Sequence, residues 1–231
     1  MLTREIDKAL YESYSDDIPQ LLKKIYAARS VTESQLSMAL PGLLKPSFDQ
    51  LSIALDLLQQ CIEEDRRVLI VGDFDADGAT ASVVAIKALR LMGAKYVDFL
   101  VPNRFKHGYG LSPEIVNEAK VEKEPNLIIT VDNGISSNEG AALARSLGID
   151  VIITDHHLPP KELPDANAII NPNLRGCDFP SKNLAGVGVC FYLFSSLKTH
   201  LDSIGYFEKN NIKVPDLRVL LDLVALGTVA D

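Results

Sequence analysis

The sequence has few cysteines and no long apolar run. Its three cysteines, at positions 61, 177 and 190, are widely spaced and odd in number, which suits a reducing cytoplasm better than a disulfide framework. None falls in a Cys-x-x-Cys spacing, so no zinc or iron–sulfur site is indicated. No run of about 18 apolar residues is present, and the first seven residues lack the apolar core of a signal peptide. A cytoplasmic protein without membrane contact is expected.

Positive charge is also scarce. Lys and Arg number 23 against 31 Asp and Glu, for a net charge of −8. Nucleic-acid-binding proteins usually carry a basic footprint, so this chain alone should not hold nucleic acid tightly by charge. Six aspartates contribute to the excess and would lose about four charges to two divalent ions: Asp73, Asp75, Asp77, Asp132, Asp155 and Asp231. Net charge therefore neither confirms nor excludes a polyanionic substrate.

From residue 66 onward, short apolar runs alternate with helical patterns. Strands are expected at 68–72, 96–101, 127–131 and 150–154, with a further short run at 168–170. The expected helices are 79–92, one opened by Ser112-Pro113, one opened by the capping box Ser136-x-x-Glu139, one near 187–201, and 217–226 ended by Gly227. This alternation predicts an α/β domain over 66–231, with a doubly wound, mostly parallel sheet flanked by helices. Right-handed crossovers would place the carboxyl ends of its strands on one edge.

The first 65 residues show helical periodicity, with apolar residues three and four apart. They are expected to form a helical segment that packs on the core, with docking to another domain or partner as the alternative. The chain stops directly after an apolar helix, which is expected of a fragment cut at a domain boundary.

The segment Gly72-Asp-Phe-Asp-Ala-Asp-Gly78 follows the first expected strand. Its alternating aspartates would lie on one side of an extended loop, and three like charges so close together are costly without cations. The alternatives are a solvated turn and a calcium loop, but the residues after Gly78 lack the ligand pattern of an EF-hand loop. Metal binding is the favoured interpretation.

Three more polar segments follow expected strands or a helix, and the last of them, 227–231, would indicate little on its own. Asp132-Asn133-Gly134 alone would indicate only a turn. In Asp155-His156-His157 the adjacent histidines point in different directions, so one can bind metal while the other faces a substrate oxygen. Oxygen ligands with one imidazole favour Mn²⁺ or Mg²⁺ over zinc. A carboxylate bridging two such ions is typical of phosphoryl hydrolysis.

The four segments 72–78, 131–135, 154–157 and 227–231 resemble, in order, the motifs of the DHH phosphoesterase superfamily. Segments 102–111 and 184–189 resemble its bacterial branch of 5′→3′ exonucleases specific for single-stranded DNA. The resemblance implies metal ligands from every motif: Asp73, Asp75, Asp77, the bridging Asp132, His156 and Asp231. It further implies that His157 contacts a phosphate oxygen and that Asp155 orients a histidine. Asp132, His156 and His157 form the expected catalytic set.

Substrate contacts are expected from Asn103 and Arg104, whose guanidinium fork suits a phosphate. An ordinary surface arginine is the alternative. Gly186 and Gly188 would let the main chain approach a phosphate at a helix start, or would serve helix–sheet packing. Aromatic residues at 105 and 109 are expected to belong to the core rather than to stack on bases, and His107 and His200 are expected to be structural.

The resemblance implies a two-metal exonuclease core that hydrolyses single-stranded DNA in repair and recombination, with a single-strand-binding protein and a helicase as further partners. The C-terminal DHH-associated domain of that branch is expected to be absent, so that activity would be weakened or lost. The alternatives are a DHH-type phosphoesterase acting on short oligonucleotides, cyclic dinucleotides, pyrophosphate or polyphosphate, and a non-enzymatic scaffold. A Rossmann nucleotide site is disfavoured, because 72–78 is not G-x-G-x-x-G.

Overall fold

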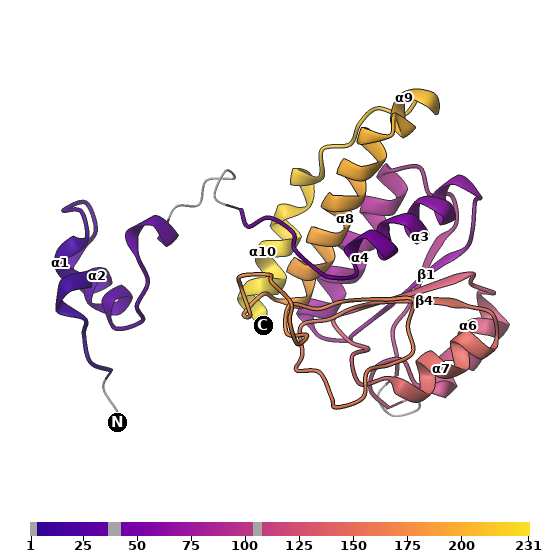
Figure 1. Cartoon of the computed structure of the whole chain (residues 1–231), viewed down its shortest axis with the longest axis horizontal. Coiled ribbons are helices and arrows are strands. Elements are labelled where there is room, and N and C mark those ends of the chain that lie inside the picture. The colour runs from indigo at the N-terminus through magenta and orange to yellow at the C-terminus, as the bar shows by residue number, and fades with distance from the viewer. Residues whose placement is uncertain (1–3, 37–42, 104–107) are drawn as a thin grey trace. The chain divides into compact units, whose positions relative to one another are not determined.

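A computed structural model describes residues 4–36, 43–103 and 108–231 (Figure 1). The chain divides into two compact units, Met1–Lys45 and Pro46–Asp231. Within its described residues, 4–36 and 43–45, the first unit contains two α-helices and one 3₁₀ helix, α1 (Lys8–Ser13), α2 (Gln20–Ala27) and η1 (Glu33–Leu36). The second unit begins before the boundary at residue 65 that the sequence predicted. The reason is that α3 (Leu51–Glu63) packs within the second unit against its sheet and α8.

The second unit is built on a five-stranded sheet in the order β2-β1-β3-β4-β5, and every neighbouring pair is parallel. Its strands are β1 (Val68–Gly72), β2 (Val97–Leu100), β3 (Leu127–Val131), β4 (Asp150–Thr154) and β5 (Ala168–Ile170). The alternating pattern thus correctly predicted a parallel α/β fold, and the short run at 168–170 is its fifth strand. Because the strands are parallel, their carboxyl ends share one edge.

Helices cover both faces of the sheet, which explains why every residue of β1 and β3 is buried (Figure 1). Along β1, Val68 and Ile70 pack in one apolar cluster, while Leu69 and Val71 pack in the other. The first cluster includes α3, α4 (Ala76–Leu91), α8 (Gly186–Ser203) and α9 (Tyr206–Lys209). The second includes α6 (Pro113–Glu122) and α7 (Asn138–Ser146).

Two helix starts differ from those predicted. Helix α4 begins at Ala76 rather than at residue 79, because the Asp75 carboxylate caps it by accepting from the Gly78 amide at 2.9 Å. The predicted capping box of α7 does not form. The cap residue is Ser137, and its hydroxyl accepts instead from the Leu111 amide at 3.1 Å, which ties the loop before α6 to α7.

The last helix, α10 (Leu221–Ala230), follows the 3₁₀ helix η3 (Leu217–Leu220), which Asp216 caps. Contrary to prediction, Gly227 lies inside α10 rather than ending it. A Cβ at Gly227 would lie 2.4 Å from Thr80 Oγ1 and 2.8 Å from Val187 Cγ1. The glycine therefore permits close packing of α10 on α4 and α8, and the helix continues to Ala230, directly before Asp231.

Within the described ranges, no helix combines the length and apolarity needed to span a membrane. The cytoplasmic location that the cysteine content suggested stays a prediction.

Candidate metal centre

The carboxyl edge of the sheet gathers every carboxylate and histidine that the sequence singled out as a ligand. Three overlapping groups have potential ligand atoms within 4.8 Å of one another: Asp73 with Asp75 and Asp132; Asp77 with His156 and Asp231; and Asp132 with His156 and His157. Asp132 and His156 each belong to two groups. The four motifs thus converge on one place, as expected of parallel strands.

Asp132 is aimed at this place by the turn after β3. Its backbone has a left-handed φ of 61°, a conformation that Asp tolerates better than most residues. The next side chain, Asn133, is fully buried and donates to the carbonyl oxygens of Val71 at 3.0 Å and Val131 at 2.9 Å. This amide ties the ends of β1 and β3 together and so fixes the start of the turn.

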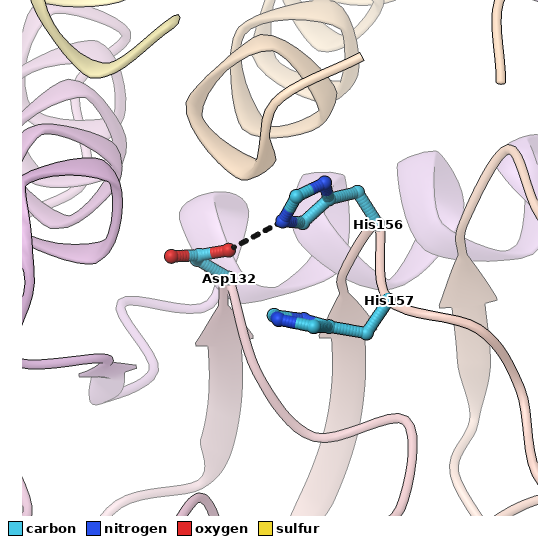
Figure 2. Close-up of side chains that lie close together, drawn as sticks. All are labelled: Asp132, His156 and His157. Carbon is cyan, nitrogen blue, oxygen red and sulfur yellow. Dashed lines mark ion pairs between the residues drawn. The ribbon is translucent and has the colours of Figure 1, made fainter. Parts of the chain in front are cut away.

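The Asp132 carboxylate is 2% exposed, and its Oδ1 lies 3.2 Å from His156 Nε2 (Figure 2). Across the described residues, this Oδ1 accepts no aligned hydrogen bond. Burial raises the pKa of Asp132 to about 7; the His156 ring opposes the shift, and the Asp77 carboxylate adds to it. A buried carboxylate oxygen without a hydrogen-bond donor is costly, and a cation would satisfy it.

Asp77 lies in the first turn of α4 and faces the start of α8. Its Oδ2 accepts from the Gly186 amide at 2.6 Å, and its Oδ1 accepts from the Val187 amide at 2.8 Å. The helix terminus thereby favours the charged carboxylate. Burial nevertheless raises the pKa of Asp77 above its ordinary value. Because Asp77 belongs to a helix, the three motif aspartates do not share the extended loop that the sequence predicted.

His156 occupies the middle of the cluster. Its Nε2 lies 3.9 Å from Asp77 Oδ2 and 3.8 Å from Asp231 Oδ1, in addition to its short distance to Asp132. The Asp132 contact raises the pKa of His156, and burial partly opposes this. A single imidazole thus faces three carboxylates from three different motifs.

Asp155 holds the neighbouring histidine. It is 1% exposed, and its Oδ1 lies 2.7 Å from His157 Nδ1, while its Oδ2 accepts from the Ile135 amide at 2.9 Å. The Asp155 hydrogen bond raises the pKa of His157 to about 9. Burial would raise the pKa of Asp155, but its bonds to the His157 ring and to backbone amides lower it. Asp155 thus contacts the His157 ring directly, and its role in orienting a histidine stays a prediction.

The Asp155–His157 pair should titrate at alkaline pH. A histidine pKa raised from 6.5 to about 9 adds stability that is complete below pH 6.5 and is lost as the pH rises through about 9. In an NMR titration of the metal-free protein, the His157 ring should titrate near pH 9, and Asp155→Asn should bring this pKa down toward 6.5. A midpoint near 6.5 in the parent protein would contradict the assignment.

Asp73 and Asp75 border the cluster on the β1 side. Asp73 Oδ1 accepts from the Phe74 amide at 2.7 Å, while exposed Asp75 also caps α4. The Tyr109 ring centroid lies 6.4 Å from that of His157, edge to face. Burial and the Asp73 charge raise the pKa of Tyr109. Tyr109 is 52% exposed, so the expected core role is wrong and its ring borders the site.

The structure describes only some of the residues that were predicted to contact the substrate. Arg104 lies outside the described residues, as do Phe105 and His107, while Asn103 is the last described residue before them. The Gly186 amide already serves Asp77, and a Cβ on Gly188 would lie 2.6 Å from Leu184 Cδ1. The phosphate contacts expected of these residues stay predictions. His200 Nε2 lies 2.7 Å from Gln59 Oε1, in keeping with the structural role expected of it.

Sequence reasoning did not single out the asparagines after β5. Asn171 and Asn173 donate to the main-chain carbonyls of the two site histidines. Their signal in the sequence is slight, consisting of two amides that flank Pro172 directly after a short strand. The pairing joins residues far apart in the sequence, so no local pattern predicts it.

The donor set of the centre suits hard divalent cations. Carboxylates outnumber the single central imidazole, which favours Mn²⁺ or Mg²⁺ over zinc. Parallel strands, an acidic carboxyl edge and a histidine pair define a class: an α/β domain with a metal centre suited to phosphoryl chemistry.

Comparison with known proteins agrees with this class. The profile of the DHH family, N-terminal domain, matches residues 67–228. The single-stranded-DNA-specific exonuclease RecJ of Escherichia coli strain K12 is 52% identical, over 99% of this chain and 39% of its own length. A crystal structure of exonuclease RecJ bound to manganese is 34% identical, with a TM-score of 0.64, over 80% of this chain and 43% of its own. RecJ from Thermus thermophilus in complex with Mn²⁺ is 29% identical, with a TM-score of 0.70, over 96% of this chain and 30% of its own.

The chain therefore belongs to the DHH family. It spans about two fifths of the length of three curated relatives that it matches.

Proposed function

We propose that this chain is the catalytic domain of a metal-dependent 5′→3′ exonuclease that hydrolyses phosphodiester bonds of single-stranded DNA. The main observation behind the proposal is that the four motif segments meet around the buried Asp132 Oδ1. Among the described residues, this oxygen accepts no aligned hydrogen bond. The proposed substrate, single-stranded DNA, is taken from the relatives, which are named as exonucleases specific for it. A single-strand-binding protein and a helicase stay predictions as further partners.

The ligands proposed for two divalent cations, Mn²⁺ or Mg²⁺, are Asp73, Asp75, Asp77, Asp132, His156 and Asp231. When bound, such ions activate water and neutralise charge on a phosphodiester. Asp132 belongs to two ligand groups and is the proposed bridge between the ions.

His157 is the proposed contact to a phosphate oxygen. Its Nδ1 faces Asp155, whose carboxylate raises the pKa of His157 and so favours the protonated ring. A protonated imidazole donates from both nitrogens, so its Nε2 would have a proton to donate to the substrate. Figure 2 shows both histidine rings projecting toward Asp132 from the same segment, and this arrangement supports the proposed role of His157.

A substrate panel tests the proposal. With Mn²⁺, the chain should release nucleotides from a 5′-phosphorylated single strand in preference to a duplex, short oligonucleotides, cyclic dinucleotides or pyrophosphate, and chelation should stop the reaction. Labels at the 5′ or 3′ end would show the direction of degradation. Turnover of pyrophosphate or dinucleotides alone would refute the substrate assignment and favour another DHH-type phosphoesterase.

A further inference from the structure

The loop after β5 holds the main chain of both site histidines. Asn173 Nδ2 donates to the His156 carbonyl oxygen at 2.5 Å, and Asn171 Nδ2 donates to the His157 carbonyl oxygen at 2.9 Å. Asn171 is 1% exposed, and its Oδ1 accepts from the main-chain amide of Asn173 at 2.7 Å. The two asparagines therefore form one connected hydrogen-bonded unit beside the ends of β4 and β5.

The peptide groups of the histidine pair are held from both sides by side chains. The amides of His156 and His157 donate to Asp155 Oδ1 at 2.7 and 3.0 Å, while their carbonyls accept from the asparagines. Both residues lie beyond the end of β4 at Thr154. Here side chains make the main-chain bonds that a neighbouring strand makes within the sheet.

We propose that Asn171 and Asn173 are positioning residues of the metal centre. By fixing the peptide planes of His156 and His157, their amides set the directions in which the two imidazoles leave the main chain. His156 Nε2 is thereby kept 3.2 Å from Asp132 Oδ1. This inference rests on the proposed function, because it takes His156 as a metal ligand.

The same loop also leads to the opposite side of the centre. Lys182 Nζ donates to the carbonyl oxygens of Pro172 at 2.6 Å and Cys177 at 2.8 Å, which fastens the loop to its own start. The loop then enters α8, whose first amides bind Asp77. One segment, 171–187, thus holds the histidines at one end and Asp77 at the other.

An amide side chain is suited to this role. Asn offers a donor and an acceptor without charge, so it can bond a carbonyl and an amide together beside an acidic centre. Removing the Asn173 amide leaves the His156 carbonyl without this donor, and the ring is then less restrained. Losing an outer partner of a metal ligand typically weakens metal binding by about 10-fold to 100-fold.

The test is Mn²⁺ affinity, measured on the full chain by the electron paramagnetic resonance of unbound Mn²⁺. Asn173→Ala and Asn171→Ala should each weaken binding by about 10-fold to 100-fold. Asn167→Ala is the matched control, because Asn167 makes an equivalent pair of bonds at the other end of β4, to the Val151 amide and to Asp150 Oδ1, both at 2.8 Å. This control should leave Mn²⁺ affinity unchanged.

A double-mutant cycle separates positioning from a general loss of stability. If Asn173 acts through His156, then Asn173→Ala should weaken Mn²⁺ binding in the parent but have little further effect in a His156→Ala background. Equal effects in both backgrounds, or parent-like affinity in Asn173→Ala, would overturn the inference while the proposed function stands. No Mn²⁺ binding by the parent would overturn both. Circular dichroism reports folding, and half-buried Asn173 carries the test if Asn171→Ala does not fold.

Discussion

Asp132→Asn should reduce Mn²⁺-dependent nuclease activity by at least about 100-fold, beyond the usual cost of losing an outer partner of a ligand. The amide keeps the shape of the carboxylate but loses its charge, in a residue that belongs to two of the three ligand groups. The fold should survive, because Asp132 Oδ1 makes no aligned hydrogen bond among the described residues. Because burial raises the pKa of the Asp132 carboxyl, replacing it with a neutral amide should even favour folding of the metal-free protein. Initial rates and thermal melting measure the two effects.

Asp150→Asn is the matched control for this substitution. Asp150 lies at the amino end of β4, at the sheet edge opposite the centre, where it pairs with Arg66 and Arg145 at 3.6 and 3.3 Å. Loss of these surface pairs should cost at most about 1 kcal/mol and no activity. Full activity in Asp132→Asn would remove Asp132 from the catalytic set.

Gly186→Ala should damage the centre although it replaces none of the proposed ligands. An added Cβ would lie 2.4 Å from Asp132 Oδ1 and 2.7 Å from its Cγ. The Gly186 main chain cannot move away easily, because its amide is bound to Asp77. Asp132 cannot move easily either, because Asn133 fixes its turn. We expect a stability loss of about 1–3 kcal/mol from overpacking. Displacement of Asp132 should also weaken Mn²⁺ binding by at least about 10-fold.

Gly188→Ala is the control for Gly186→Ala. It shows whether a loss of Mn²⁺ affinity comes from displacement of Asp132 or from any methyl group added at the start of α8. A Cβ at Gly188 would meet Leu184 Cδ1 at 2.6 Å and Leu184 Cγ at 2.9 Å, so the clash is with a movable apolar side chain. This variant should lose stability yet bind Mn²⁺ like the parent. Equal losses of Mn²⁺ affinity in the two variants, measured by calorimetry, would show that Gly186 has no special relation to Asp132.

The parallel sheet could be predicted because it depends on local patterns. Apolar runs of five residues, such as 127–131, each followed by a polar turn and a helical period, permit few other folds. The site followed from the same logic, because residues after parallel strands meet at one edge. Helix boundaries were less predictable where a tertiary contact replaced a local rule. Gly227 resembles a helix stop in sequence, yet it lies inside α10 because α4 and α8 approach too closely for a side chain.

What the sequence could not predict is which residues support the proposed ligands. Asp77 receives the first amides of α8, residues more than a hundred positions away, and Asn173 supports His156 across the end of a strand. Such contacts depend on the register of β4 against β5 and on where α8 begins. Ligand types follow from the chemistry of the metal, whereas the residues that orient them follow from the packed fold.

The proposed metal centre is tested most directly by Mn²⁺ anomalous scattering from crystals of the chain grown with Mn²⁺. We expect two peaks at the carboxyl edge of the sheet, roughly 3.5–4 Å apart, both in contact with Asp132 and with His156 among their ligands. In Asp132→Asn crystals the pair of peaks should be lost. Manganese bound elsewhere, or an edge without a peak at saturating Mn²⁺, would contradict the proposal that these residues form a metal centre.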